Sequence, residues 1–260
     1  MLAIFNKTLA HPPKELHSPD SSRSAKKSNL IPEEILKDFL SSHPDNAFSM
    51  SFNSAAVLAY VRPDLIYSLH NQRLFCGYDE IYCVFMGSLS NLCSLNRQYG
   101  LTKNTNEAML VIEAYRTLRD RGPYPADQVI KELDGSFAFV VFDRKDGTVF
   151  AALSSDGGVK LHWGIAEDDS VVISDDLKVI KTSCGKSFAP FPTGCMFHSG
   201  GGLTSFEHPM NKVKAMPRVD SEGVMCGSIF KVDVFSRNST MPRVGSEANW
   251  AAWNSYDRHH

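Results

Sequence analysis

Residues Leu133–Phe139 read LDGSFAF, and here the hydrophobic pattern of the chain changes from helical to extended. Apolar, β-favouring residues continue to Asp143, and a second such run covers Thr148–Leu153. The pair Asp146-Gly147 stands between the two runs, and Asp-Gly is a strong signal for a tight turn between antiparallel strands. The stretch therefore predicts a β-hairpin whose first strand is Phe137–Asp143.

A second hairpin is expected on the carboxy-terminal side, where Leu161–Ile165 and Val171–Ser174 flank an acidic turn. Hairpins imply antiparallel pairing. Helical patterns lie between groups of strands and do not follow every strand. This order is typical of the α+β class, with helices layered on antiparallel sheets.

Helices are predicted mainly on the amino-terminal side of the opening stretch. One begins at Pro32, a residue favoured in the first helical position. Another follows Gly87, carries Leu89, Leu92 and Cys93 inward, and ends at Gly100, which can adopt the left-handed conformation. The clearest helix has Asn104 as its cap, Glu107 at a capping-box spacing, and a stop at Gly122-Pro123.

Composition and charge restrict the class of protein. The chain has 260 residues, 43% hydrophobic and 22% charged, and a net charge of −2, which argues against a nucleic-acid partner. Its longest apolar runs are too short to span a bilayer, and the start is unlike a signal peptide. We expect one domain over residues 1–234 and a disordered tail over 235–260. We also expect a cytoplasmic location, with the nucleus or the periphery of the plasma membrane left open.

No cofactor or metal site is expected from the residues alone. The six cysteines lack the spacing of zinc ligands. Asp175-Asp176 could hold a metal, but a solvated strand end is the favoured interpretation. Gly185-Lys186-Ser187 lacks the upstream glycine of a phosphate-binding loop.

Several motifs, in a fixed order, resemble the class-II glutamine amidotransferases, which use an N-terminal nucleophile. They are Met1–Phe5, Asn71–Leu74, Val84–Asn91, Asn106–Leu110, Leu133–Phe139 and Phe191–Gly194. The chain is similar over more of its length to a plant family described as aluminium-induced or stem-specific proteins. YGL at Tyr99–Leu101, LRDR at Leu118–Arg121, Lys186–Pro192 and Phe206–Pro209 carry that resemblance. It implies a four-layer αββα sandwich of two antiparallel sheets, as in N-terminal-nucleophile hydrolases.

The resemblance also locates a vestigial site. Amidotransferases of this class attack the glutamine amide with a cysteine at the position of Leu2, which has no nucleophilic atom. Their oxyanion asparagine corresponds to Met86, although the backbone N–H of Gly87 remains. The carboxylates that hold the substrate amine correspond to Ser88 and approximately to Glu107. We therefore expect no catalytic residues, and a pseudoenzyme in which Leu2 fills the space of the missing thiol.

Arg73 matches the arginine that holds the substrate carboxylate. With Gly87 and Glu107 it is a candidate ligand site for a small amino acid. The alternative is a structural ion pair with Glu107 or a nearby aspartate. A relocated nucleophile at Cys76 or Cys83 is a third, weaker hypothesis.

Three functions remain open on this basis. The first is a stress- or hormone-responsive regulatory or interaction protein, expected to be a homodimer through an apolar surface near residues 87–101. The second is a sensor of amino acids or carboxylates. The third is an amidohydrolase with an unconventional cysteine.

Overall fold

The computed structural model describes residues 1–18, 32–62, 72–120, 126–219, 223 and 225–237. Three sequence expectations fall on other residues. Asn71, the helix stop at Gly122-Pro123, and the tail beyond residue 237 lie outside the described part of the chain.

The first sheet contains, among the described residues, six strands in the order β10-β8-β9-β1-β3-β2. All neighbouring strands are antiparallel. Their bounds are Phe188–Pro190 (β10), His162–Ile165 (β8), Val171–Ser174 (β9), Leu2–Phe5 (β1), Ala56–Val61 (β3) and Ala47–Phe52 (β2).

The second sheet also has six strands within the described ranges, in the order β12-β11-β7-β6-β5-β4, and is antiparallel throughout. Its strands are Gly202–Ser205 (β12), Cys195–His198 (β11), Thr148–Leu153 (β7), Gly135–Asp143 (β6), Ile81–Leu89 (β5) and Arg73–Tyr78 (β4). The hairpin predicted around Asp146-Gly147 is β6–β7, which confirms the interpretation of the opening stretch.

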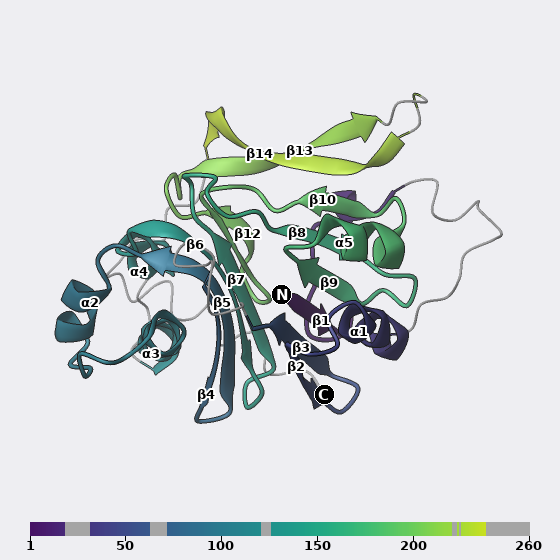
Figure 1. The fold of residues 1–260 in the computed structure, drawn as a ribbon. Helices are drawn as coiled ribbons and strands as arrows, with labels where there is room; N and C mark the ends of the chain where they lie inside the picture. Colours follow the sequence, from purple (N-terminus) through teal and green to yellow (C-terminus); the bar gives the residue numbers. More distant parts are fainter. Residues whose placement is uncertain (19–31, 63–71, 121–125, 220–222, 224, 238–260) are drawn as a thin grey trace, which may run out of the picture.

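Helices cover the outer face of each sheet (Figure 1). On the first sheet lie α1 (Pro32–Ser41) and α5 (Leu177–Cys184); on the second lie α2 (Leu92–Gln98), α3 (Glu107–Asp120) and α4 (Ala126–Lys131). A separate ribbon, β13 (Asn211–Val219) paired with β14 (Met225–Arg237), packs over β10 and the short helix η1 (Lys14–Leu16). The α+β class and the four-layer arrangement of two antiparallel sheets are therefore confirmed.

Within the described ranges, three hydrophobic cores follow from the alternation of side chains along the strands. The central core lies between the sheets and contains Phe5, Phe142 and Trp163. Each of the other two lies between a sheet and its helices. Strand β1 shows the alternation that matters for the site. Met1 and Ala3 face the central core, whereas Leu2 and Ile4 face α1 and α5.

Three expected boundaries were wrong. The cap of α3 is Asn106, whose Oδ1 accepts from the Met109 N–H at 2.9 Å, and not Asn104. Strand β5 continues to Leu89, and α2 begins at Leu92 with Leu95 buried and Cys93 exposed. The β5 strand is longer than expected because it pairs with β6 along its whole length, from Ile81 to Leu89. At the other end, β14 reaches Arg237, three residues beyond the expected end of the domain, because the ribbon pairs Asn211 with Arg237.

None of the described helices is both long enough and apolar enough to cross a membrane.

Candidate functional site

The start of β1 lies at one end of the space between the two sheets, and an ion-pair network occupies it. The Met1 α-amine is bonded to the carboxylate of Asp175. The same carboxylate accepts hydrogen bonds from Arg73, at 3.2 Å from Nε and 2.5 Å from Nη2. We call Met1, Arg73 and Asp175 the inner site.

Strand pairing explains why residues so far apart in sequence meet here. Leu2 pairs with Ser174 across β1 and β9, and the Ser174 hydroxyl donates to the Met1 carbonyl at 2.8 Å. Asp175 is the next residue, so its side chain reaches the central space beside Met1. Arg73 comes from the opposite sheet, where it begins β4. The network therefore ties the two sheets together at this end.

The inner site is well shielded from solvent. The side chain of Asp175 is 13% exposed and that of Arg73 is 28% exposed. Burial alone would raise the pKa of Asp175, but the Met1 amine and Arg73 together hold it below its usual range. Burial lowers the pKa of the Met1 amine, although Asp175 opposes the shift. Asp175 is thus an anion whose two partners both come from this chain.

Met86 and Gly87 lie next to the inner site on β5. Met86 pairs with Arg73 across β4 and β5 and is buried in the central core. The Gly87 N–H donates to the carbonyl of Gln72 at 2.9 Å, so this candidate oxyanion donor already has a partner. Gly87 has φ +103°, and a Cβ there would lie 2.0 Å from the Ser136 carbonyl oxygen, so only glycine fits. Ser88, the next residue, pairs with Ser136 on β6.

Glu107 is buried at the first position of α3, where the helix dipole favours a negative charge. It accepts a hydrogen bond from Gln72 Nε2 at 3.3 Å. The structural alternative for Arg73 is therefore realised with Asp175 and not with Glu107. Gln72 connects the two neighbourhoods, because its carbonyl binds Gly87 and its side chain binds Glu107.

Leu2 does not face the inner site. Its side chain is fully buried on the helical side of the first sheet, in the core that includes Ile4 and Phe39. Residue 1, and not residue 2, therefore presents its amine to Asp175.

Nothing in the local sequence indicated that Asp175 would be central, and the expectation of a solvated strand end was wrong for this residue. Asp176 is half-buried and caps α5 by accepting from the Lys178 N–H at 2.7 Å. No group of side chains in the described ranges is arranged to hold a metal ion.

Cys76 and Cys83 face each other across β4 and β5 on the side of α3. Burial raises the pKa of both thiols, and the effect is large for the fully buried Cys83. The Cys76 thiol contacts the Met109 sulfur at 3.7 Å. A raised pKa disfavours the thiolate that acts as the nucleophile.

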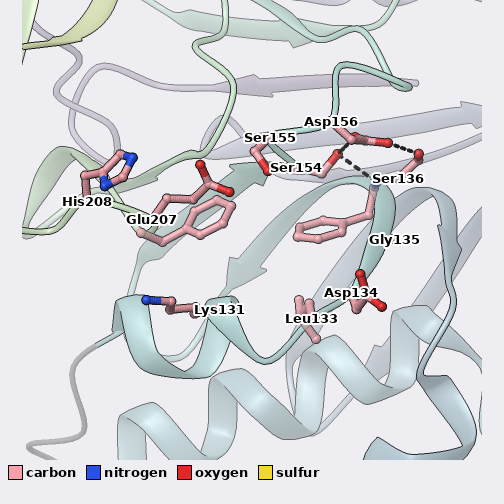
Figure 2. Close-up of a pocket in the computed structure, with 12 residues that line it drawn as sticks. Lys131, Leu133, Asp134, Gly135, Ser136, Ser154, Ser155, Asp156, Glu207 and His208 are labelled. Carbon is pink, nitrogen blue, oxygen red and sulfur yellow. Dashed lines mark hydrogen bonds between the residues drawn. The ribbon is translucent and has the colours of Figure 1, made fainter. Parts of the chain in front are cut away.

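A second region, the outer cavity, lies where β6 and β7 meet α4 and the segment after β12 (Figure 2). It has a volume of about 770 Å³. The Ser154 hydroxyl donates to Asp156 at 2.6 Å and accepts from the Phe137 N–H at 3.0 Å. Ser136 also donates to Asp156. The sequence motifs around Ser136 and Glu207 carried the family resemblance, but no local signal connected them into one cavity.

The chain belongs to the Aluminium induced protein family, whose model matches residues 2–232. The stem-specific protein TSJT1 of Nicotiana tabacum is 39% identical over 157 residues, which are 58% of this chain and 99% of that protein. The resemblance based on the YGL and LRDR motifs is thereby confirmed.

Glutamine-hydrolyzing asparagine synthetases match a smaller part. The probable enzyme of Dictyostelium discoideum is 42% identical over 73 residues, 28% of this chain and 13% of that enzyme. The Zea mays enzyme is 29% identical over 115 residues, 44% of this chain and 20% of that enzyme. The matched segments thus span a fifth or less of these synthetases.

Among solved structures, the glutamine phosphoribosylpyrophosphate amidotransferase of B. subtilis, complexed with ADP and GMP, matches with a TM-score of 0.49 and 14% identity. The match covers 91% of this chain and 49% of that chain. A glutamine aminotransferase class-II domain protein from Silicibacter pomeroyi matches with a TM-score of 0.39 and 11% identity, over 76% of this chain and 86% of that chain.

Proposed function

We propose that this member of the Aluminium induced protein family is a catalytically silent amidotransferase-like domain whose inner site is occupied by its own carboxylate. One observation carries the proposal: Asp175 binds Arg73 through two guanidinium nitrogens and also binds the Met1 amine. A carboxylate ligand would have to displace Asp175 from Arg73. That exchange would leave the largely buried Asp175 with the Met1 amine as its one remaining partner of the two, which is costly.

The chemistry of glutamine hydrolysis supports the same conclusion. A cysteine thiolate would attack the amide carbon and a base would take up its proton. Leu2 offers neither a nucleophile nor a proton acceptor, and its side chain faces the helices. The Met1 amine, the base available at this end of the chain, is bonded to Asp175.

An oxyanion hole is also missing from the described residues of the inner site. The Met86 side chain has no hydrogen-bond donor, and the Gly87 N–H is used by Gln72. Loss of one oxyanion donor costs an enzyme about 3–4 kcal/mol of transition-state stabilisation. The lack of a nucleophile and the lack of an oxyanion donor therefore both act against glutamine hydrolysis.

Catalysis by an unconventional cysteine is a less well supported function. Cys76, Cys83 and Cys195 all have raised pKa values because of burial, and the pKa of Cys195 is about 12. Neutral, buried thiols are poor nucleophiles. The role that remains is binding, and we assign the domain to the regulatory or interaction proteins, acting as a homodimer. The surface near residues 87–101, expected to carry the dimer contact, exposes no large apolar side chain, so that part of the expectation was wrong.

The experiment is ammonia release from glutamine by wild type, Leu2→Cys, and Leu2→Cys with Met86→Asn. Mass spectrometry would establish which residue starts each purified chain. We expect no release by wild type or by the single variant, and weak release only by the double variant. Enzyme-dependent release by wild type would overturn the proposal, and rapid release by Leu2→Cys alone would show that Met86 and Asp175 do not block the site.

A further inference from the structure

The outer cavity is physically separate from the inner site and shares none of its three residues. Its volume of about 770 Å³ lies within the usual range of small-molecule sites, roughly 300–1,000 Å³. Its walls come from four parts of the chain: α4 and the turn after it, the start of β6, the segment after β7, and the segment after β12. Three of these belong to or adjoin the second sheet, so the walls rest on a rigid support.

The floor of the cavity is aromatic. Phe137 and Phe206 are buried, and their rings stack with centroids 6.5 Å apart. Leu133 lies beside them at the lower edge (Figure 2). An aromatic floor of this kind suits the methylene chains of a ligand, and the faces of aromatic rings also attract cations.

Carboxylates surround this floor. Asp156 stands on one side and Glu207 on the other, and Asp134 lies below (Figure 2). Serine hydroxyls donate to Asp134 and Asp156, and neither carboxylate forms an ion pair with a cationic side chain of the described ranges. Lys131 and His208, both exposed, also line the rim, and of these Lys131 carries a positive charge. The charge of the lining therefore favours a cation.

Asp156 is the best-prepared of these carboxylates. Burial would raise its pKa, but the hydroxyls of Ser136 and Ser154, with backbone N–H groups, hold the pKa below its usual range. The Ser154 hydroxyl is itself fixed by the Phe137 N–H. A ligand thus meets an oriented anion at little further cost in conformational entropy.

The spacing of the carboxylates distinguishes an organic cation from a metal ion. No set of three acidic, histidine or cysteine side chains in the described ranges comes close enough to hold one ion. Separate carboxylates around an apolar floor suit a ligand with several ammonium groups joined by methylene chains. Each ammonium can then meet one carboxylate while the methylenes cover the rings.

We propose that the outer cavity is a binding site for an aliphatic polyamine. Its ammonium groups bind Asp156, Asp134 and Glu207, and its chain lies over Phe137 and Phe206. This proposal does not depend on whether the inner site lacks catalytic activity, because the two sites share no residues.

The test is isothermal titration of the full-length protein with spermidine at low ionic strength. Asp156→Asn removes the anchoring charge. Asp168→Asn is a matched control, because Asp168 also accepts from a nearby serine, Ser170, at 2.6 Å, but lies in the β8–β9 turn outside the cavity. A third variant, Phe206→Leu, keeps the floor apolar but removes one ring.

We expect wild type and Asp168→Asn to bind spermidine with affinities within about twofold. Asp156→Asn should weaken binding about tenfold, the size of effect typical of one charge-assisted contact. Phe206→Leu should weaken it about threefold. Equal affinity in Asp156→Asn and wild type, an affinity for Mg²⁺ as high as that for spermidine, or no binding by wild type at millimolar spermidine would each overturn the proposal.

Discussion

The inner site and the outer cavity both centre on an aspartate with a lowered pKa, yet they are built in opposite ways. Asp175 is shielded and is bound by two cationic groups of the chain itself. Asp156 is exposed and is bound by the hydroxyls of Ser136 and Ser154. Hydroxyl donors stabilise a carboxylate without cancelling its charge, whereas cationic partners cancel it. This difference is the basis of our two proposals, that the first site is closed to ligands and that the second binds a cation.

The comparison also shows how the two regions are held apart. Strands β5 and β6 form a wall between them: Met86 of β5 pairs with Arg73 of the inner site, Ser136 of β6 lines the outer cavity, and the backbones of Gly87 and Ser136 are in close contact. The two regions should therefore respond differently to mutation, except at this shared wall.

The largest effect is expected at the shared wall, from Gly87→Ala. The new Cβ would lie 2.0 Å from the Ser136 carbonyl oxygen, and φ +103° is strained for any side chain. We expect the free energy of unfolding to fall by more than about 4 kcal/mol, measured by urea denaturation. Gly100→Ala is the control, because its φ is also positive, +69°, but nothing lies within 4 Å. It should cost about 1 kcal/mol, and equal losses in the two variants would show that the β5–β6 contact is looser than described.

The next effect separates the two aspartates. Asp175→Asn leaves the Met1 amine and Arg73 without their shared anion. We expect a loss of roughly 2–4 kcal/mol, below the full range for buried pairs because Arg73 is 28% exposed. Asp156→Asn should cost less than about 1 kcal/mol, since its surroundings are solvated. If the two substitutions destabilised the protein equally, the contrast between the regions would be lost.

A smaller effect should appear in acid. The folded-state pKa of Asp175 is lowered, so its stabilising contribution is present above the unfolded value of about 3.9 and disappears as pH falls through the folded-state value. The difference in unfolding free energy between wild type and Asp175→Asn should therefore be constant from pH 7 to about pH 5 and should shrink below about pH 4. Denaturation curves at intervals of about half a pH unit, down to about pH 2.5, would measure it. A difference that stays constant throughout would mean that Asp175 is not ion-paired.

The smallest effect is expected from removing residues 238–260. The described residues of both regions all precede Arg237, the last residue of β14. Truncation after Arg237 should leave the melting temperature within about 2 °C of wild type, which corresponds to less than about 0.5–1 kcal/mol for a protein of this size. A fall of several degrees in a calorimetric scan would mean that these residues contribute to the folded domain.

Local sequence signals predicted much of the fold because their physics is local. The turn at Asp146-Gly147 and the left-handed Gly100, with φ +69°, act within a few residues. The helix expected after Gly87 was misplaced because pairing with β6 extends β5 to Leu89. Long-range pairing overrode the local pattern there.

The inner site could be predicted only in part. Arg73 was singled out, and an ion pair with an acidic residue was one of its two interpretations. Its partner was not identifiable, because Asp175 is 102 residues away from Arg73 and 174 from Met1. An aspartate after a strand normally marks a solvated end, and only the β1–β9 pairing brings this one inside. The direction of the Leu2 side chain could not be predicted either, because it depends on which side of the first sheet carries α1 and α5.

The most direct test of the closed inner site is calorimetric titration of the wild-type protein with glutamine and with glutamate, up to millimolar concentrations at neutral pH. Because Asp175 already occupies Arg73, we predict no saturable heat with either amino acid. Saturable binding to wild type that is lost in Arg73→Ala, with that variant still folded by circular dichroism, would contradict the account, since it would show that Arg73 is open to a carboxylate ligand.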